Sequence, residues 1–297
     1  MHNLQYLPSS ISEKIITLRT IVRSLLVSSI IYSFPSNAVA DTLTVGLSDG
    51  SDFQTIQEAV SAAAEGDTVY VNAGIYNEAI TLTRAITLQG ANAGVDPNTD
   101  SRGEESVITG SGSIRIIASA QNVVIDGFEI TNTEGALSYE HGAILIPPRN
   151  DGSTVGGADF NQVGNITIRN NWFHDLNARP VLKDCFAAFT NLTIANNRIE
   201  AVGNDENARS GIKLQSRCQA GTQSSGLVIR ANVIRNTTYA GIIVDSIDGI
   251  TISDNTISNT PEHGINLGAS YGNNNVLISD NHVSEAALPN GLSLIHI

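Results

Sequence analysis

Two basic residues four positions apart, Arg209 and Lys213, have side chains suited to chemistry on an acidic substrate. An arginine can hold a carboxylate through two hydrogen bonds, and a lysine can act as a base when neighbouring cations lower its pKa. Neutralising a carboxylate and removing a proton beside it are the two requirements of a β-elimination on a uronic acid polymer. Arg209 and Lys213 are therefore the candidate catalytic residues, with the lysine as the base.

Further basic residues lie near this pair in the sequence. Of the 13 lysine and arginine residues after position 40, eight fall between Arg179 and Arg235. On an acidic protein, such a concentration predicts a local basic strip that binds an anionic polysaccharide. The candidate substrate-binding residues are Arg179, Lys183, Arg217, Asp245 and Asn266. The alternative is a set of solvated surface charges balanced by Asp184, Asp205 and Glu206.

Four acidic residues in the C-terminal part are candidate calcium ligands, because calcium binds carboxylate oxygens. These residues are Asp245, Asp248, Asp254 and Glu262. Their spacing does not define a ligand set, so the sequence allows calcium without fixing a site for it. It indicates no other cofactor.

An internal repeat supplies the elements that must position these side chains. Six nine-residue segments align without gaps, and they begin at Asn122, Asn165, Asn191, Gly226, Gly249 and Asn275. The second, fourth and ninth residues of each copy are apolar, which predicts a strand, a tight turn and a second strand with one buried face. The seventh residue is asparagine in five copies. Such a column predicts stacked asparagines at a turn with left-handed backbone.

A third short strand is predicted after each copy, at residues 142–146, 180–183, 211–215, 241–245, 264–268 and 291–294. Three strands per copy, with copies 23 to 43 residues apart, predict an all-β fold, a right-handed three-sided parallel β-helix. Alternation along the third strands places Lys213, Asp245 and Asn266 on the outer face, and burying Leu182 would also point Lys183 outward. A sandwich of antiparallel hairpins is the competing fold, and it would need two-residue turns.

The two ends of the predicted β-helix differ. A helix is expected at Phe53–Ala64, where it would cap the N-terminal end, with Ser51 and Gln54 in capping-box spacing and Gly66 after the last turn. The last predicted strand has no helix or polar cap after it. We therefore expect the β-helix to be truncated at its C-terminal end.

The first 40 residues have the composition of a signal peptide. Basic residues precede an apolar stretch at positions 25–34, and Ala38-Val39-Ala40 has the pattern of a cleavage site. An N-terminal membrane anchor is the alternative, although the apolar stretch is short for a span. The sequence thus predicts a secreted, periplasmic or cell-surface protein. In such a compartment Cys185 and Cys218 could form a disulfide or stay as buried thiols.

Residues 41–297 are expected to form one domain and a monomer, with no later membrane span. The whole chain has a net charge of −13, and the first 40 residues contain three basic and one acidic side chain, so residues 41–297 have a net charge of −15. This charge argues against a nucleic acid partner.

The residues from Ser51 to Val60 and from Ala73 to Glu78 resemble the opening of pectin-lyase-like proteins, a superfamily of right-handed parallel β-helices that includes pectin methylesterases. The resemblance covers residues 43–295 and implies substrate binding along the face that bears the third strands. The catalytic patterns of the pectin methylesterases, polygalacturonases, pectate lyases and mannuronan epimerases are not found. The resemblance therefore implies a fold and a carbohydrate partner without an assigned enzyme family.

Two functions from different classes follow. The first is an enzyme acting on an acidic polysaccharide, with β-elimination as the reaction and Lys213 and Arg209 as the working pair. The second is a non-catalytic adhesin or stalk that binds glycans. Residues 150–162 and 203–210 are long enough to build the walls of a groove, which favours the first, because a stalk needs short, uniform turns.

Overall fold

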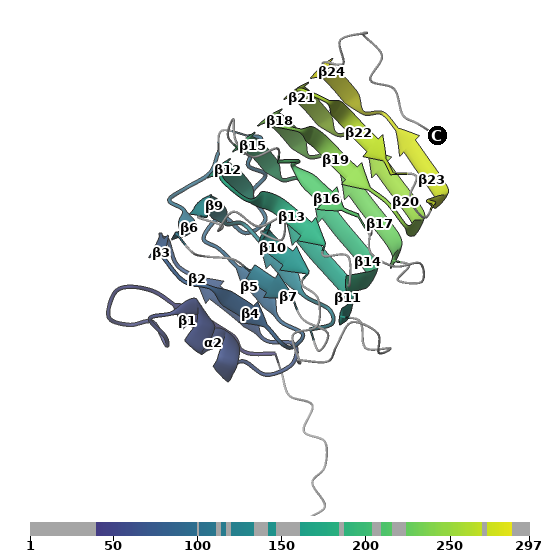
Figure 1. The fold of residues 1–297 in the computed structure, drawn as a ribbon. Coiled ribbons are helices and arrows are strands. Elements are labelled where there is room, and N and C mark those ends of the chain that lie inside the picture. Colours follow the sequence, from purple (N-terminus) through teal and green to yellow (C-terminus); the bar gives the residue numbers. More distant parts are fainter. Residues whose placement is uncertain are drawn as a thin grey trace, which may run out of the picture. The chain divides into compact units, whose positions relative to one another are not determined.

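Parallel strands form three sheets, and the chain passes through them in turn (Figure 1). The structure is a computed structural model, and it describes residues 40–99, 101–110, 114–116, 120–133, 142–146, 161–183, 187–203, 209–215, 224–268 and 272–286. All of these residues belong to the unit Ala40–Ile297. One passage through the three sheets is called a rung below.

The three sheets correspond to the three strands expected in each rung. Among the described residues, the first sheet contains β1 (Thr42–Val45), β2 (Thr68–Val71), β5 (Thr87–Gln89), β8 (Val124–Asp126), β11 (Asn161–Arg169), β14 (Ala187–Ala195), β17 (Ser224–Arg230), β20 (Ile247–Ser253) and β23 (Asn274–Ser279). The second contains β3 (Gly74–Tyr76), β6 (Ser106–Gly110), β9 (Glu129–Thr133), β12 (Trp172–Leu176), β15 (Arg198–Val202), β18 (Val233–Thr237), β21 (Thr256–Thr260) and β24 (His282–Ala286). The third contains β4 (Ile80–Leu82), β7 (Ile114–Ile116), β10 (Gly142–Ile146), β13 (Arg179–Lys183), β16 (Ile212–Leu214), β19 (Ala240–Val244) and β22 (His263–Leu267).

Each strand pairs in parallel with the equivalent strand of the next rung. In the first sheet, Ile168 of β11 pairs with Ile125 of β8 on one side and with Ile194 of β14 on the other. Equivalent positions of the repeat therefore stack directly over one another. This register confirms the predicted three-sided parallel β-helix and excludes the sandwich of antiparallel hairpins.

Columns of identical apolar side chains fill the interior. The isoleucines at the fourth position of the repeat are fully buried and lie in register from rung to rung; they are Ile125, Ile168, Ile194, Ile229 and Ile252. Branched side chains of this kind pack well on a pleated surface, and each rung covers the apolar face of the one before it. The core thus follows from the repeat itself.

The predicted stack of asparagines is confirmed. The backbone N–H and the side-chain Nδ2 of Asn171 both donate to Oδ1 of Asn197, at 3.0 and 3.1 Å. The same two bonds link Asn197 to Asn232, Asn232 to Asn255 and Asn255 to Asn281. These contacts satisfy polar groups that would otherwise be buried without partners at the turn between the first and second sheets.

The left-handed backbone of this turn lies one residue earlier than the sequence predicted. The sixth position of the repeat, and not the seventh, has positive φ, as in Asn170 (54°), Asn196 (54°) and Asp254 (58°). The seventh residue turns its amide inward to stack, so the residue before it makes the sharp change in chain direction. Asparagine and aspartate tolerate this conformation better than most residues.

The helix α2 (Ile56–Ala62) packs over the N-terminal strands but is shorter than expected. Thr55 is its N-cap, and the Oγ1 atom of Thr55 accepts a hydrogen bond from Glu58 N, so the predicted cap at Ser51 is wrong. The carboxylate of Glu78 accepts bonds from the N–H groups of Ile56 and Gln57, both at 2.9 Å. A carboxylate at this end of a helix is favourable. No helix in the described chain is long and apolar enough to cross a membrane.

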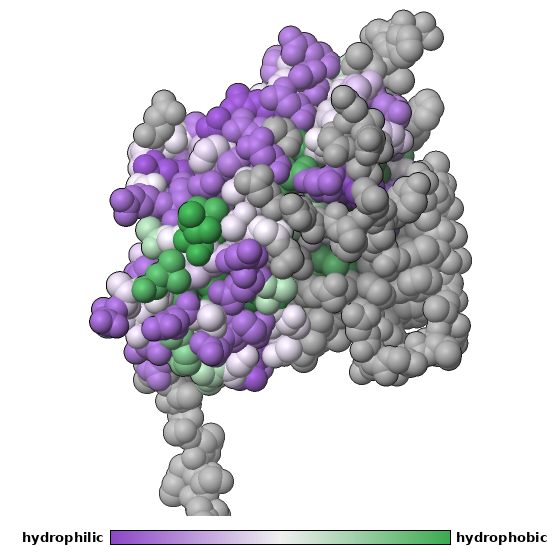
Figure 2. All heavy atoms as spheres, turned by 60° about the vertical axis from the view of Figure 1, so that its left-hand side comes forward, coloured by the Kyte–Doolittle hydropathy of each residue, from purple (hydrophilic) through white to green (hydrophobic). Residues whose placement is uncertain are grey.

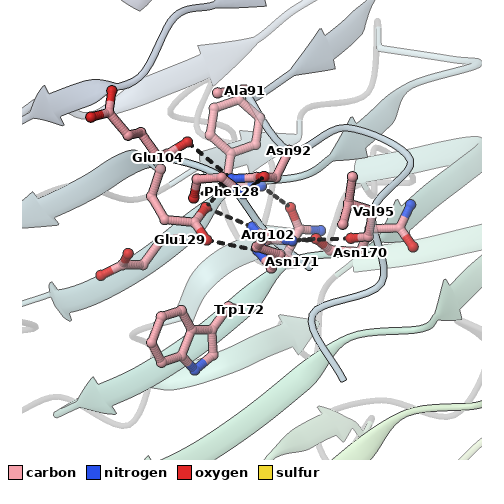
Figure 3. Close-up of polar contacts among 12 residues, drawn as sticks. Ala91, Asn92, Val95, Arg102, Glu104, Phe128, Glu129, Asn170, Asn171 and Trp172 are labelled. Atoms are coloured by element: carbon pink, nitrogen blue, oxygen red, sulfur yellow. Dashed lines mark hydrogen bonds and ion pairs between the residues drawn. The ribbon is translucent and has the colours of Figure 1, made fainter. Parts of the chain in front are cut away.

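An insertion between β5 and β6 is fastened to the outside of the turns by Arg102 (Figure 3). Its guanidinium binds both carboxylate oxygens of Glu105 at 2.7 Å. It also donates to the carbonyl oxygens of Val95 and Asn170, at 3.1 and 2.8 Å. One side chain therefore joins both ends of the insertion to the turn that precedes β12.

Candidate functional site

The outer face of the third sheet carries the predicted catalytic lysine. Lys213 lies in one row with Leu182 of the preceding rung, Ile243 of the following rung and Asn266 beyond it. Lys213 and Asn266 are partly exposed, whereas their neighbours Ile212 and Leu214 are buried in the core. The predicted outward orientation of Lys213 and Asn266 is confirmed.

The predicted outward orientation of Lys183 is wrong. Lys183 pairs with Ile146 and Leu214, which are core residues, and it is 1% exposed. Its Nζ donates to the carbonyl oxygen of Ala187 at 2.6 Å. Val181, and not Leu182, points into the core, so Lys183, two residues further along the strand, points inward as well. A shift of one residue in the register reverses the direction of every side chain of a strand.

Two further members of the predicted basic strip are buried. Arg179 is 5% exposed and Arg209 is 4% exposed, and the backbone N–H of Arg209 is bound to Oγ1 of Thr238 at 2.9 Å. Arg217 lies outside the described residues. Of the four candidate residues Arg179, Lys183, Arg209 and Lys213, all within the described chain, Lys213 is the one with a partly exposed side chain.

The candidate calcium ligands do not converge. Asp245 follows β19 and is fully buried. Asp248 accepts a hydrogen bond from Asn275 in the first sheet, and Asp254 is exposed at a turn. The described residues contain no group of three histidine, cysteine or acidic side chains that could hold a metal. Most of both predicted groove walls, at residues 150–162 and 203–210, and both cysteines lie outside the described residues.

The outer face of the second sheet brings together a cluster that the sequence analysis did not find. Two outward rows run along this sheet, because Ile130, Phe173 and Ile199 between them are buried. One row pairs Glu129 with Trp172 and Trp172 with Arg198, and the other pairs His174 with Glu200 and Glu200 with Arg235. We call these six residues the Trp172 face. Figure 2 shows this side of the molecule, on which hydrophilic side chains predominate.

Trp172 is held in place by contacts on several sides. Its indole Nε1 donates to Oε1 of Glu200 at 3.0 Å. The centroid of its ring lies 4.2 Å from that of His174, with 32° between the ring planes, and the guanidinium carbon of Arg198 lies 5.5 Å from the ring centroid. The last distance is within the range of a cation–π contact. The orientation of the indole is therefore fixed before any ligand arrives.

Glu200 is the electrostatic centre of the Trp172 face. Its carboxylate forms ion pairs with Nε of Arg235 at 2.7 Å and Nε of Arg198 at 3.0 Å. Burial alone would raise the pKa of Glu200, but hydrogen bonds from Arg235, Trp172 and Arg198 outweigh it and lower the pKa below the ordinary value of 4.5. Glu200 is therefore a carboxylate at neutral pH and acts as a hydrogen-bond acceptor.

His174 connects the cluster to a second carboxylate. Its Nε2 lies 3.0 Å from Oε1 of Glu129, and its Nδ1 lies 2.7 Å from Oδ2 of Asp175. The Trp172 face thus combines a flat aromatic ring with hydrogen-bonding groups on the strands around it. Such a surface can bind a molecule that has an apolar face and a rim of hydroxyl groups, as a sugar ring has.

The sequence held a signal for this cluster. Its members occupy the eighth position of the repeat (Glu129, Trp172 and Arg198) and the position after the ninth (His174, Glu200 and Arg235). Alternation about the buried ninth residue places both positions outside. Trp172 is also the single tryptophan of the chain. The analysis of the sequence followed the basic residues of the third strands and passed over this pattern.

The sequence matches a protein family described as "Right handed beta helix region", over residues 62–295. Comparison with curated proteins finds no match. Similar solved structures include the GH136 lacto-N-biosidase from Eubacterium ramulus, with a TM-score of 0.51 and 10% identity, covering 92% of this chain and 58% of that one. This chain thus corresponds to 58% of the length of that protein.

Two other similar structures have lower TM-scores. PfbA, a surface adhesin of Streptococcus pneumoniae, has a TM-score of 0.47 and 17% identity, covering 77% of this chain and 67% of that one. The pectin methylesterase from Aspergillus niger has a TM-score of 0.42 and 14% identity, covering 84% and 87%. At such identities the similarity shows the fold alone. The predicted right-handed winding agrees with the description of the matched family.

Proposed function

Because this chain belongs to the right-handed β-helix family, we propose that it uses a long, flat sheet face to bind a polysaccharide, and that the Trp172 face is where a sugar ring docks. The observation that carries the proposal is the position of the chain's single tryptophan. It lies on an outward row, with its indole N–H bound to Glu200 and charged side chains on the neighbouring strands.

Rigid placement of the indole favours binding. A side chain that is already fixed loses little conformational freedom when a ligand stacks on it, so more of the contact energy appears as affinity. Glu200 fixes the indole, and Arg198 and Arg235 fix Glu200 in turn. Polar groups that are held in this way can exchange hydrogen bonds with sugar hydroxyls without first becoming ordered.

The shape of the second sheet favours a polymer as the ligand. Equivalent outward residues recur at every rung, about 4.8 Å apart, so the face extends as a row along the solenoid axis. Beyond the Trp172 face the same rows continue through Val233, Thr256, Ser258 and His282. An extended glycan chain can contact several rungs at once, which adds weak contacts together.

Binding to a panel of acidic and neutral polysaccharides, measured by isothermal titration calorimetry, tests the proposal. For a polymer that binds, Trp172→Ala is expected to weaken affinity about fivefold or more, because an aromatic contact contributes roughly 1 kcal/mol or more. Thr193→Ala, on the outer side of the first sheet, is the control and should bind as the wild type does. If Trp172→Ala binds with unchanged affinity, the Trp172 face is not the binding surface.

A lyase is the second candidate function, and the partly exposed side chain of Lys213 on the outer row of the third sheet is the observation that favours it. The buried side chain of Arg209 weighs against the complete pair. Absorbance of unsaturated uronides, with pectic, alginate and glycosaminoglycan polymers and with or without calcium, distinguishes cleavage from binding. A rise in absorbance that Lys213→Ala abolishes would establish elimination with Lys213 as the base.

Export is part of the proposal, because the first 40 residues have the composition of a signal peptide. We propose that residues 1–40 act as a signal peptide. Mass spectrometry of the protein recovered from a secreting host tests this point. A mature N-terminus at Asp41 is expected, and recovery of the uncleaved chain in the membrane fraction would instead support the N-terminal anchor.

A further inference from the structure

The carboxylate of Asp245 is buried in a way that its protein neighbours do not explain. Asp245 is 0% exposed, and among the described residues neither Oδ1 nor Oδ2 has a hydrogen-bond partner. No ion pair to Asp245 is found among the described residues. Buried polar groups are almost always hydrogen-bonded, and an ionised carboxylate without a partner is especially unfavourable. Something with positive charge is therefore needed at this position.

Two neighbouring side chains present oxygen atoms in the same condition. Oε1 of Gln215 and Oγ of Ser246 are buried, and neither has a hydrogen-bond partner in the part of the chain that the structure describes. Leu214, Val244 and Leu267 pair in register, so Gln215 and Asp245 follow the ends of adjacent strands, about 4.8 Å apart. Ser246 is the next residue after Asp245. Four side-chain oxygen atoms without a partner among the described residues therefore belong to three residues at one end of the third sheet.

Gly268 of the next rung leaves room for the carboxylate. A Cβ atom at this position would lie 2.8 Å from Cγ and 2.9 Å from Oδ2 of Asp245. Gly268 does not have a positive φ, so the space that it leaves, and not its backbone freedom, is its contribution. Asp245 thus leans over the following strand end and spans two rungs.

The nearby donors are already directed elsewhere. Nδ2 of Asn273 donates to the carbonyl oxygens of Val244 and Gly268, at 3.4 and 3.2 Å, and not to Asp245. The N–H of Asp245 itself donates to Leu214 O, and that of Ile247 donates to Oδ1 of Asn273. These neighbouring donors therefore do not satisfy the carboxylate of Asp245. Oxygen atoms from a carboxylate, an amide and a hydroxyl form the ligand type preferred by hard cations.

We propose that Asp245, Gln215 and Ser246 form a calcium site that joins the strand ends of two adjacent rungs. This site shares only Asp245 with the four acids that the sequence suggested, and its other ligands are neutral. One charged ligand predicts weak binding, with a Kd of about 0.1 to 1 mM, because calcium affinity rises with the number of charged ligands. The role of the ion is structural, and the inference is independent of the Trp172 face.

Thermal unfolding of the full chain tests the site. After treatment with a chelator, about 10 mM calcium is expected to raise the Tm of the wild type by about 3 °C or more. Asp245→Asn keeps the shape of the side chain and removes its charge, so it should still fold but lose the rise. Asp254→Asn removes the same charge from an exposed turn and should keep it. The same concentration of magnesium should have little effect, since magnesium requires stricter octahedral geometry.

Calcium titration by calorimetry provides a second measurement that does not depend on unfolding. A saturable heat in the wild type that is absent in Asp245→Asn supports the site. Absence of both the heat and the Tm shift in the wild type would overturn it. An equal shift in Asp245→Asn, or an equal shift with magnesium, would also overturn it, because either result indicates general screening of an acidic protein.

Discussion

The indole Nε1 of Trp172 lies 3.0 Å from Oε1 of Glu200, and this hydrogen bond crosses from β12 to the next strand of the second sheet. It ties the single tryptophan to a carboxylate that two arginines also hold. The bond fixes the direction of the ring plane, and it gives Glu200 a neutral donor in addition to its cationic ones. The Trp172 face is therefore ordered by its own contacts.

The contacts of Glu200 predict a dependence of stability on pH. Although burial alone would raise the pKa of Glu200, hydrogen bonds led by that from Arg235 lower it in the folded state. A carboxyl of this kind stabilises the fold above its unfolded pKa, and the stabilisation is lost as the pH falls through the folded value. Urea unfolding at about pH 7 and about pH 3 should show a smaller loss of stability on acidification for Glu200→Gln than for the wild type.

Asp52→Asn is a useful comparison for that experiment. The pKa of the Asp52 carboxyl is also lowered, by hydrogen bonds from the backbone and side chain of Thr44, but Asp52 is fully exposed. We expect it to change the pH dependence little, because exposed pairs contribute little to stability. The account of Glu200 would be contradicted if Glu200→Gln and the wild type lost equal free energy of unfolding between the two pH values.

The asparagine stack predicts a position-specific loss of stability. In Asn232→Ala, the N–H and Nδ2 of Asn197 lose their acceptor inside the turn. A buried donor without a partner costs about 1–3 kcal/mol, so the free energy of unfolding should fall by about 2 kcal/mol or more. Denaturant unfolding measures the change.

Asn191→Gly serves as the control for the stack. Asn191 is exposed, has a φ of 58° that glycine also adopts, and makes one side-chain bond, to Asn165. Its replacement should cost about 1 kcal/mol or less. If Asn191→Gly and Asn232→Ala lose equal free energy of unfolding, the buried stack contributes no more to stability than an exposed hydrogen bond.

Arg102 predicts the behaviour of the insertion before β6. Lysine at this position keeps the charge but lacks the planar fork that reaches Glu105 with two bonds while contacting two carbonyl oxygens. In Arg102→Lys, limited proteolysis within residues 90–105 should therefore become faster, while the far-ultraviolet circular dichroism stays that of a β-helix. An unchanged rate of cleavage would mean that other contacts hold the insertion.

Lys183 predicts a negative result for glycan binding. Its side chain is buried, and Nζ is bound to Ala187 O. We expect Lys183→Met to change thermal stability but to leave polysaccharide affinity within about twofold of the wild type, a difference below about 0.5 kcal/mol. A drop of tenfold or more in a variant that still folds would return Lys183 to the substrate-binding surface.

Much of the fold could be predicted from the sequence because neighbouring residues within each copy of the repeat determine which side chains point inward. The repeat predicts inward positions for Ile168, Asn171 and Phe173. Because the spacing within each copy is equal, equivalent positions then stack in register from rung to rung. The helix could not be placed exactly, since its N-terminus is fixed by Glu78, which lies 22 residues from Ile56 along the chain. That contact exists only after the β-helix has begun to wind.

The site was harder to predict because orientation does not decide exposure. Asp245 has the outward place that alternation assigned, yet it is fully buried. An inward Leu182 predicted an outward Lys183, but the register of Lys183 with Ile146 and Leu214 places it inside. The Trp172 face could be predicted only from the outward positions of its residues in the repeat, and not from their chemical types. Its residues share no chemical type, so no composition pattern marked them.

The most direct test of the central claim uses the intrinsic fluorescence of Trp172, because the chain contains no other tryptophan. Titration with the polysaccharide that binds most tightly should shift or quench this signal with the same Kd that calorimetry gives. Arg230→Ala, which removes an exposed arginine from the first sheet, should leave the titration unchanged. Saturable binding by calorimetry without any change in the fluorescence of Trp172 would contradict the assignment of the Trp172 face as the glycan-binding surface.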